Sequence, residues 1–230
     1  MTDVIELVDE LFGSPVRYGV TYAALVIQGD RTIAERYKGV LPHLDGLPEP
    51  VGPETKFLSW SIAKSLLHTA VGVLVDAGRL DADASAPDAE WSAPGDPRHA
   101  ITLRQLMRMR DGLQFVESYV PGSKSDTIEM LWGKGRHEVA HFAADRPLAH
   151  SPGTVFNYSS CSANIVSRIV GNEVGVGDTL HFLHDRVSIP SECPRPPRTS
   201  TRREPSSHPP LPTLRREIGR VSVSATCGAA

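Results

Sequence analysis

The composition of the chain changes abruptly near Val187, and this change limits the part that can fold. Eight of the 19 prolines lie between Pro190 and Pro212, among many Arg, Ser and Thr residues, and the apolar residues there show neither a helical nor a strand period. Such a segment buries too little apolar surface to offset the entropy lost on ordering. We therefore predict one folded region over residues 1–187 and a disordered tail over residues 188–230.

Charge and hydropathy exclude several classes of partner. The formal net charge of the 230 residues is −3, which gives no reason to expect binding to nucleic acid. No apolar stretch approaches the roughly 20 residues that span a bilayer, and the acidic N-terminus lacks the apolar run of a signal peptide. Cys161, Cys193 and Cys227 are too few and too widely spaced for a disulfide framework or a metal knuckle. We expect a cytoplasmic protein without a nucleic-acid or membrane partner.

The spacing of apolar residues predicts two strands and several helices. Strands are expected over residues 22–28 and 33–37 with a turn at Gly29-Asp30, and a loop over residues 40–53. The strongest helical pattern covers residues 61–77, where an apolar stripe runs from Ala63 to Val75. Shorter helices are expected over residues 102–109, 126–132, 137–144 and 162–170, the first with Thr102 as N-cap and Gly112 closing it.

Ser61 and Lys64 lie three residues apart at the start of the 61–77 helix. On a helix this spacing places both side chains on one face, one turn apart. A serine hydroxyl is a weak nucleophile at neutral pH, and a neighbouring uncharged amine can accept its proton during attack on a carbonyl. The helix N-terminus adds a positive field that favours the developing oxyanion. Alone, the pattern also fits a capping serine beside a solvated lysine.

Tyr158 follows the Pro152-Gly153 turn and comes just before the 162–170 helix. Near a serine-lysine pair, a phenol can act as general base and then protonate the leaving group. The alternative is a half-buried aromatic ring with its hydroxyl in water.

The order of several motifs resembles that of the class C β-lactamase-like serine hydrolases. The motifs are Ser61-x-x-Lys64, then Leu103-Arg104-Gln105-Leu106-Met107 with Asp111-Gly112-Leu113, then Pro152-Gly153 with Phe156-x-Tyr158-Ser159-Ser160. The resemblance covers roughly residues 22–187 and is strongest to the esterase and 6-aminohexanoate-dimer hydrolase branch. Several matched segments in the right order are much harder to obtain by chance than one.

The resemblance implies an α/β (α+β) fold of the β-lactamase and transpeptidase type, with an antiparallel sheet flanked by helices plus a helical region. It also implies hydrolysis of a small-molecule ester or amide through an acyl-enzyme. Ser61 is then the nucleophile, Lys64 its activating partner and Tyr158 a member of the proton relay, with Ser160 in a supporting position. No metal and no organic cofactor are implied.

Two departures from the family pattern affect these expectations. Ser160 stands where many members have Asn, and the third motif, Lys or His followed by Ser or Thr and Gly, is absent after Tyr158. Because that motif lies on a strand beside the serine, we expect an incomplete sheet. The alternative function is therefore a non-catalytic fragment or pseudoenzyme.

The sequence after Val187 also fits translation out of frame. One permitted codon set for residues 187–193, read two bases later, gives Phe-Asp-Pro-Phe-Gly-Met, which resembles the family's continuation. We expect that residues from about Ser188 onward are out of frame.

His137-Glu138-x-x-His141 matches a zinc-binding pattern in which two histidines on one helix hold the metal and the glutamate acts as base. A zinc metallohydrolase is thus a second enzymatic alternative, and an exposed helix end is the competing interpretation. His68 is interpreted as a core histidine, and Trp60 and Trp132 fit either an acyl pocket or simple packing.

Overall fold

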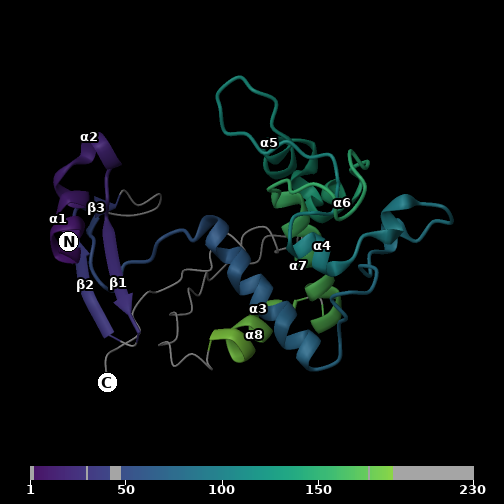
Figure 1. The fold of residues 1–230 in the computed structure, drawn as a ribbon, viewed down its shortest axis with the longest axis horizontal. Coiled ribbons are helices and arrows are strands. Elements are labelled where there is room, and N and C mark those ends of the chain that lie inside the picture. The colour runs from purple at the N-terminus through teal and green to yellow at the C-terminus, as the bar shows by residue number, and fades with distance from the viewer. Residues whose placement is uncertain (1–2, 30, 42–47, 176, 189–230) are drawn as a thin grey trace, which may run out of the picture. The chain divides into compact units, whose positions relative to one another are not determined.

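The computed structural model describes residues 3–29, 31–41, 48–175 and 177–188. Its chain forms two compact units, one ending at Ser59 and the other beginning at Trp60 (Figure 1). Except for Ser188, the predicted tail lies outside the described residues, as do Cys193 and Cys227. The disorder of the tail and its reading frame therefore stay predictions.

The first unit contains two short helices and two small antiparallel sheets. Its elements are α1 (Val4–Gly13), α2 (Pro15–Tyr18), β1 (Ala23–Gln28), β2 (Arg31–Tyr37), β3 (Val40–Leu41) and β4 (Glu49–Pro50). β1 pairs with β2 from Ala23 opposite Tyr37 to Gln28 opposite Arg31, and β3 pairs with β4. The two predicted strands are confirmed, and the predicted 40–53 loop contains the two-residue strands β3 and β4.

The second unit is helical. Its elements are η1 (Trp60–Ile62), α3 (Ala63–Asp76), η2 (Ala89–Trp91), η3 (Pro97–Ala100), α4 (Leu103–Met107), α5 (Asp126–Leu131), η4 (Lys134–His137), α6 (Val139–Ala144), α7 (Ser160–Val174), α8 (Thr179–Leu183) and η5 (His184–Ser188). α3, α4 and α6 pack against α7 (Figure 1), where buried Leu74, Leu106 and Ile165 belong to one core. In the described ranges, no helix is long and apolar enough to cross a membrane.

Together, small antiparallel sheets and a helical region confirm the predicted fold class with an incomplete sheet. The helix predicted over residues 61–77 is present as η1 followed by α3, and the helices predicted over residues 126–132 and 162–170 match α5 and part of α7. Of the predicted apolar stripe, Ala70, Val71 and Leu74 are buried. Burial of this stripe fixes which face of α3 turns away from the core.

α4 begins as predicted and ends differently. Thr102 caps it in a reciprocal capping box with Gln105. Its end is closed at Met109, whose φ is 54°, so the prediction that Gly112 closes this helix is wrong. Gly112, with φ of 82°, instead lies in a tight turn where an added Cβ would come within 2.2 Å of the His150 carbonyl oxygen.

The helix predicted over residues 137–144 is present as α6, but it begins two residues later, at Val139. The chain forms the 3-10 turn η4 up to His137 and then the separate helix α6 from Val139. Between them Glu138 has φ −139° and ψ 71°, which interrupts helical geometry. Close packing contributes to the break, because Gly135 is buried directly against Met130 and Phe142.

Candidate active site

Ser61 lies in η1, immediately before the first turn of α3. Its neighbour Trp60 has φ of 44°, in the left-handed region that residues with a side chain rarely adopt. Strained backbone of this kind clusters at functional sites, where the surrounding fold has to hold it in place. The predicted partner Lys64 donates a hydrogen bond from Nζ to Ser61 Oγ over 3.0 Å. The two side chains therefore meet across one helical turn.

Residues at the start of α7 complete this group. Lys64 Nζ also lies 3.4 Å from Ser160 Oγ, and the same nitrogen is 5.2 Å from the centroid of the Tyr158 ring. A cation at this distance is attracted by the negative face of the ring. The four residues expected to form the site, from α3 and from the segment leading into α7, are thus brought together around the Lys64 ammonium group.

Glu117 is a member of the group that the sequence interpretation missed. Its carboxylate accepts hydrogen bonds from the Ser160 backbone N–H (2.6 Å), the Ser160 hydroxyl (3.1 Å) and the Tyr119 hydroxyl (2.8 Å). Desolvation, followed by the hydrogen bond to Glu117 and its charge, raises the pKa of Tyr119 to about 12. A continuous polar chain therefore runs from Ser61 through Lys64 and Ser160 to Glu117.

The start of α7 is fixed by Asp111. Ser159 is the N-cap of α7, and buried Ser162 donates from its hydroxyl to Asp111 Oδ2 over 2.6 Å. Asp111 Oδ1 accepts from the Leu113 N–H over 2.9 Å. Burial raises the pKa of Asp111, against the opposing effect of these hydrogen bonds. The motif Asp111-Gly112-Leu113 is thus a structural support beneath Ser160.

An open hollow of about 430 Å³ includes Tyr119, whose hydroxyl donates to Glu117. It is lined by residues 118–125 together with Ile128 and Glu129, and its surface is mainly apolar. Trp60 and Phe156 are 72% and 64% exposed, and Trp132 is 59% exposed. Trp60 and Trp132 therefore do not pack in the core.

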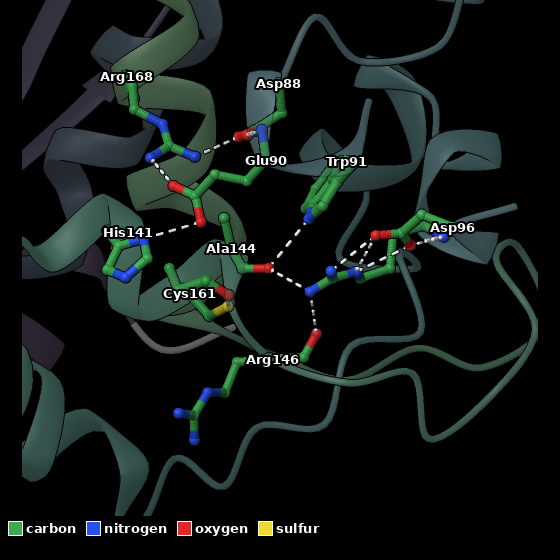
Figure 2. Close-up of polar contacts among 11 residues, drawn as sticks. Asp88, Glu90, Trp91, Asp96, His141, Ala144, Arg146, Cys161 and Arg168 are labelled. Atoms are coloured by element: carbon green, nitrogen blue, oxygen red, sulfur yellow. Dashed lines mark hydrogen bonds and ion pairs between the residues drawn. The ribbon is translucent and has the colours of Figure 1, made fainter. Parts of the chain in front are cut away.

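The zinc pattern lies elsewhere in this unit. His137 and His141 are on separate elements, and His141 Nδ1 is hydrogen-bonded to Glu90 Oε2 at 2.9 Å (Figure 2). Glu90 also pairs with Arg168, which in turn binds Asp88 (Figure 2). Throughout the part of the chain that the structure describes, no group of three or more His, Cys, Asp or Glu side chains is arranged to hold a metal. These contacts favour a structural role for His141.

His68 is exposed on α3, so its interpretation as a core histidine is wrong. Burial of part of its ring lowers the pKa of His68. Cys161 is fully buried in α7 and donates to the Ala143 carbonyl oxygen over 3.3 Å. Burial raises its pKa far above the usual thiol range, so it is not a nucleophile.

Comparison with known proteins identifies a matching family and a related hydrolase. The family model described as Beta-lactamase matches residues 7–216. The 6-aminohexanoate-dimer hydrolase of Paenarthrobacter ureafaciens is 29% identical over 161 residues, which is 66% of this chain and 38% of that protein.

Solved structures with the same fold include a candidate β-lactamase from Bacteroides dorei DSM 17855 and the D-amino acid amidase of Ochrobactrum anthropi SV3. The first is 20% identical with a TM-score of 0.59, over 83% of this chain and 52% of that one. The second is 21% identical with a TM-score of 0.54, over 81% of this chain and 52% of that one. The chain therefore spans between 38% and 52% of the length of these relatives.

Proposed function

Because the chain belongs to the β-lactamase family, whose model matches residues 7–216, we propose that it is a serine hydrolase that cleaves an ester or an amide through an acyl-enzyme on Ser61. The names of two relatives support an ester or amide substrate, since one is a hydrolase of the 6-aminohexanoate dimer and another is a D-amino acid amidase. The substrate is a small molecule, and no nucleic-acid or membrane partner is needed.

The contact between Ser61 and Lys64 supports this proposal most directly. When the Lys64 amine is uncharged, the 3.0 Å hydrogen bond reverses, so that the Ser61 hydroxyl donates to Nζ. The hydroxyl then transfers its proton to Lys64 as Ser61 Oγ attacks the carbonyl carbon. The carbonyl oxygen becomes an oxyanion, which the backbone N–H of Ser61 and the field of the α3 N-terminus stabilise.

Tyr158 and Ser160 assist the proton transfers in this proposal. Tyr158 lies against Lys64, so its phenol takes part in moving the proton from Lys64 to the leaving alcohol or amine. Collapse of the tetrahedral intermediate breaks the bond to the leaving group and leaves the acyl ester on Ser61. Water then attacks this ester with the same groups as base, which releases the acid and restores the Ser61 hydroxyl.

A fluorophosphonate probe that phosphonylates activated serines tests the proposal on the full chain. Intact mass spectrometry is expected to show one adduct on the wild-type protein and none on Ser61→Ala. Ser65→Ala is the matched control, because Ser65 is an exposed serine on the same helix and it is expected to label like wild type.

Equal labelling of wild type and Ser61→Ala removes Ser61 from the chemistry. A folded wild-type protein that neither labels nor hydrolyses p-nitrophenyl esters supports the alternative, a non-catalytic fragment or pseudoenzyme.

A further inference from the structure

Met109 closes α4 in a conformation that is normally left to glycine. Its φ is 54°, and the N–H of Met109 donates to the Leu106 carbonyl while the N–H of Arg110 donates to the Gln105 carbonyl. These two bonds are those of a Schellman motif with Met109 at the left-handed position. A side chain there destabilises the helix end relative to glycine.

The side chain and the carbonyl of Met109 both contact the residues that flank Tyr158. The Asn157 N–H donates to the Met109 carbonyl oxygen over 2.9 Å, and the Ser159 N–H donates to Met109 Sδ over 3.4 Å. Met109 and Ser159 are both buried, with 9% and 3% of their surface exposed. The thioether is thus the acceptor for a backbone N–H that water does not reach.

We infer that Met109 is a positioning residue for Tyr158, an inference that rests on the proposed function. Two bonds, one on each side of Tyr158, leave its backbone little freedom, and the ring is held 5.2 Å from Lys64 Nζ. Loss of the Sδ acceptor leaves the buried Ser159 N–H unpaired, so the segment must shift to find water or another acceptor. Glycine at position 109 relaxes α4 but supplies no such acceptor.

Exchange of the Ser159 amide hydrogen tests the contact itself. In Met109→Leu the size of the side chain is kept and the sulfur acceptor is lost, whereas Met109→Gln supplies an amide oxygen at similar length. Met130→Leu is the matched control, because Met130 is fully buried on α5 and the same chemical change is made there. Exchange at Ser159 is expected to be about tenfold faster in Met109→Leu, near wild type in Met109→Gln, and unchanged in Met130→Leu.

The rate of phosphonylation of Ser61 tests the consequence. Met109→Leu is expected to react about tenfold more slowly, and Met109→Gln and Met130→Leu within about threefold of wild type, with urea midpoints measured alongside. Equal rates for Met109→Leu and wild type overturn the inference. If Met109→Leu does not fold, the inference is overturned by a folded Met109→Gln that loses both Ser159 protection and labelling.

The two proposals fail in different ways. A wild-type chain that does not label contradicts the proposed hydrolase, while the Ser159 exchange still measures the contact with Met109. Normal labelling of every variant contradicts the positioning role alone.

Discussion

Glu117 accepts two hydrogen bonds from Ser160, one from its backbone N–H over 2.6 Å and one from its hydroxyl over 3.1 Å. With the proton of that hydroxyl directed at Glu117, an oxygen lone pair of Ser160 is free to accept from Lys64 at 3.4 Å. The Glu117 carboxylate therefore sets the orientation in which the Ser160 hydroxyl meets the Lys64 amine. It also places a negative charge near that amine, with only the Ser160 side chain between the two groups.

Replacement of Glu117 by Gln tests this orientation. The shape is kept, but an amide N–H can face the Ser160 hydroxyl and reverse the direction of that hydrogen bond. We expect phosphonylation of Ser61 to slow by about tenfold with a small change in stability. Asp145→Asn is the control, because Asp145 is an exposed carboxylate of the same unit, and it is expected to react like wild type. Equal rates for both variants contradict a role for Glu117.

Lys64→Met removes the amine and keeps most of the apolar stem. The loss of the group in contact with Ser61 Oγ is expected to slow phosphonylation by ~10²–10⁴, the range typical for a general base. Lys134→Met, a change at an exposed lysine, provides the comparison and is expected to have little effect. A Lys64→Met protein that reacts at the wild-type rate shows that Ser61 is activated by some other group.

Local spacing in the sequence is enough to predict the contact between Ser61 and Lys64. Ser61 and Lys64 are one helical turn apart, so their contact follows once the helix is identified. Ser160 and Tyr158 came from the order of the motifs. Glu117 was missed because its bonds to Ser160 join residues 43 apart, and no spacing rule predicts such a pair.

The fold was predictable to a similar extent. The apolar stripe of α3 and the β-branched strands gave strong periodic signals. α1 was not predicted, although Val4, Val8 and Leu11 lie at helical spacing and Asp3 caps the helix by accepting from the Ile5 N–H. The break at Glu138 and the left-handed Met109 depend on tertiary packing, which local propensity does not include.

Asp111 is expected to make the free energy of unfolding depend on pH. Comparison of the wild type with Asp111→Asn measures this dependence. Burial raises the pKa of Asp111, so the native state favours its protonated form. The contribution of protonated Asp111 to the free energy of unfolding is fully present below the unfolded-state pKa of about 3.9. It is lost as pH rises through the native-state pKa of Asp111. Asn keeps an acceptor for the Leu113 N–H and a donor for Ser162 without a charge.

The wild-type free energy of unfolding should therefore fall relative to that of Asp111→Asn as pH rises, by at most ~1.4 kcal/mol per pH unit. Urea titrations of both proteins between pH 4 and pH 8 measure this difference. A difference that is constant, or that moves in favour of the wild type at higher pH, contradicts the assignment.

Gly112 and Gly95 allow the effect of a clash to be separated from that of backbone strain. Both have φ of 82°, but an added Cβ at Gly112 would lie 2.2 Å from the His150 carbonyl oxygen, whereas none of the described atoms lies within 4 Å at Gly95. Gly95→Ala is expected to cost ~1–2 kcal/mol from the left-handed backbone alone. Gly112→Ala should cost at least ~2 kcal/mol more, because backbone atoms must move. Similar urea midpoints for the two variants would mean that the turn between Gly112 and His150 has room to open.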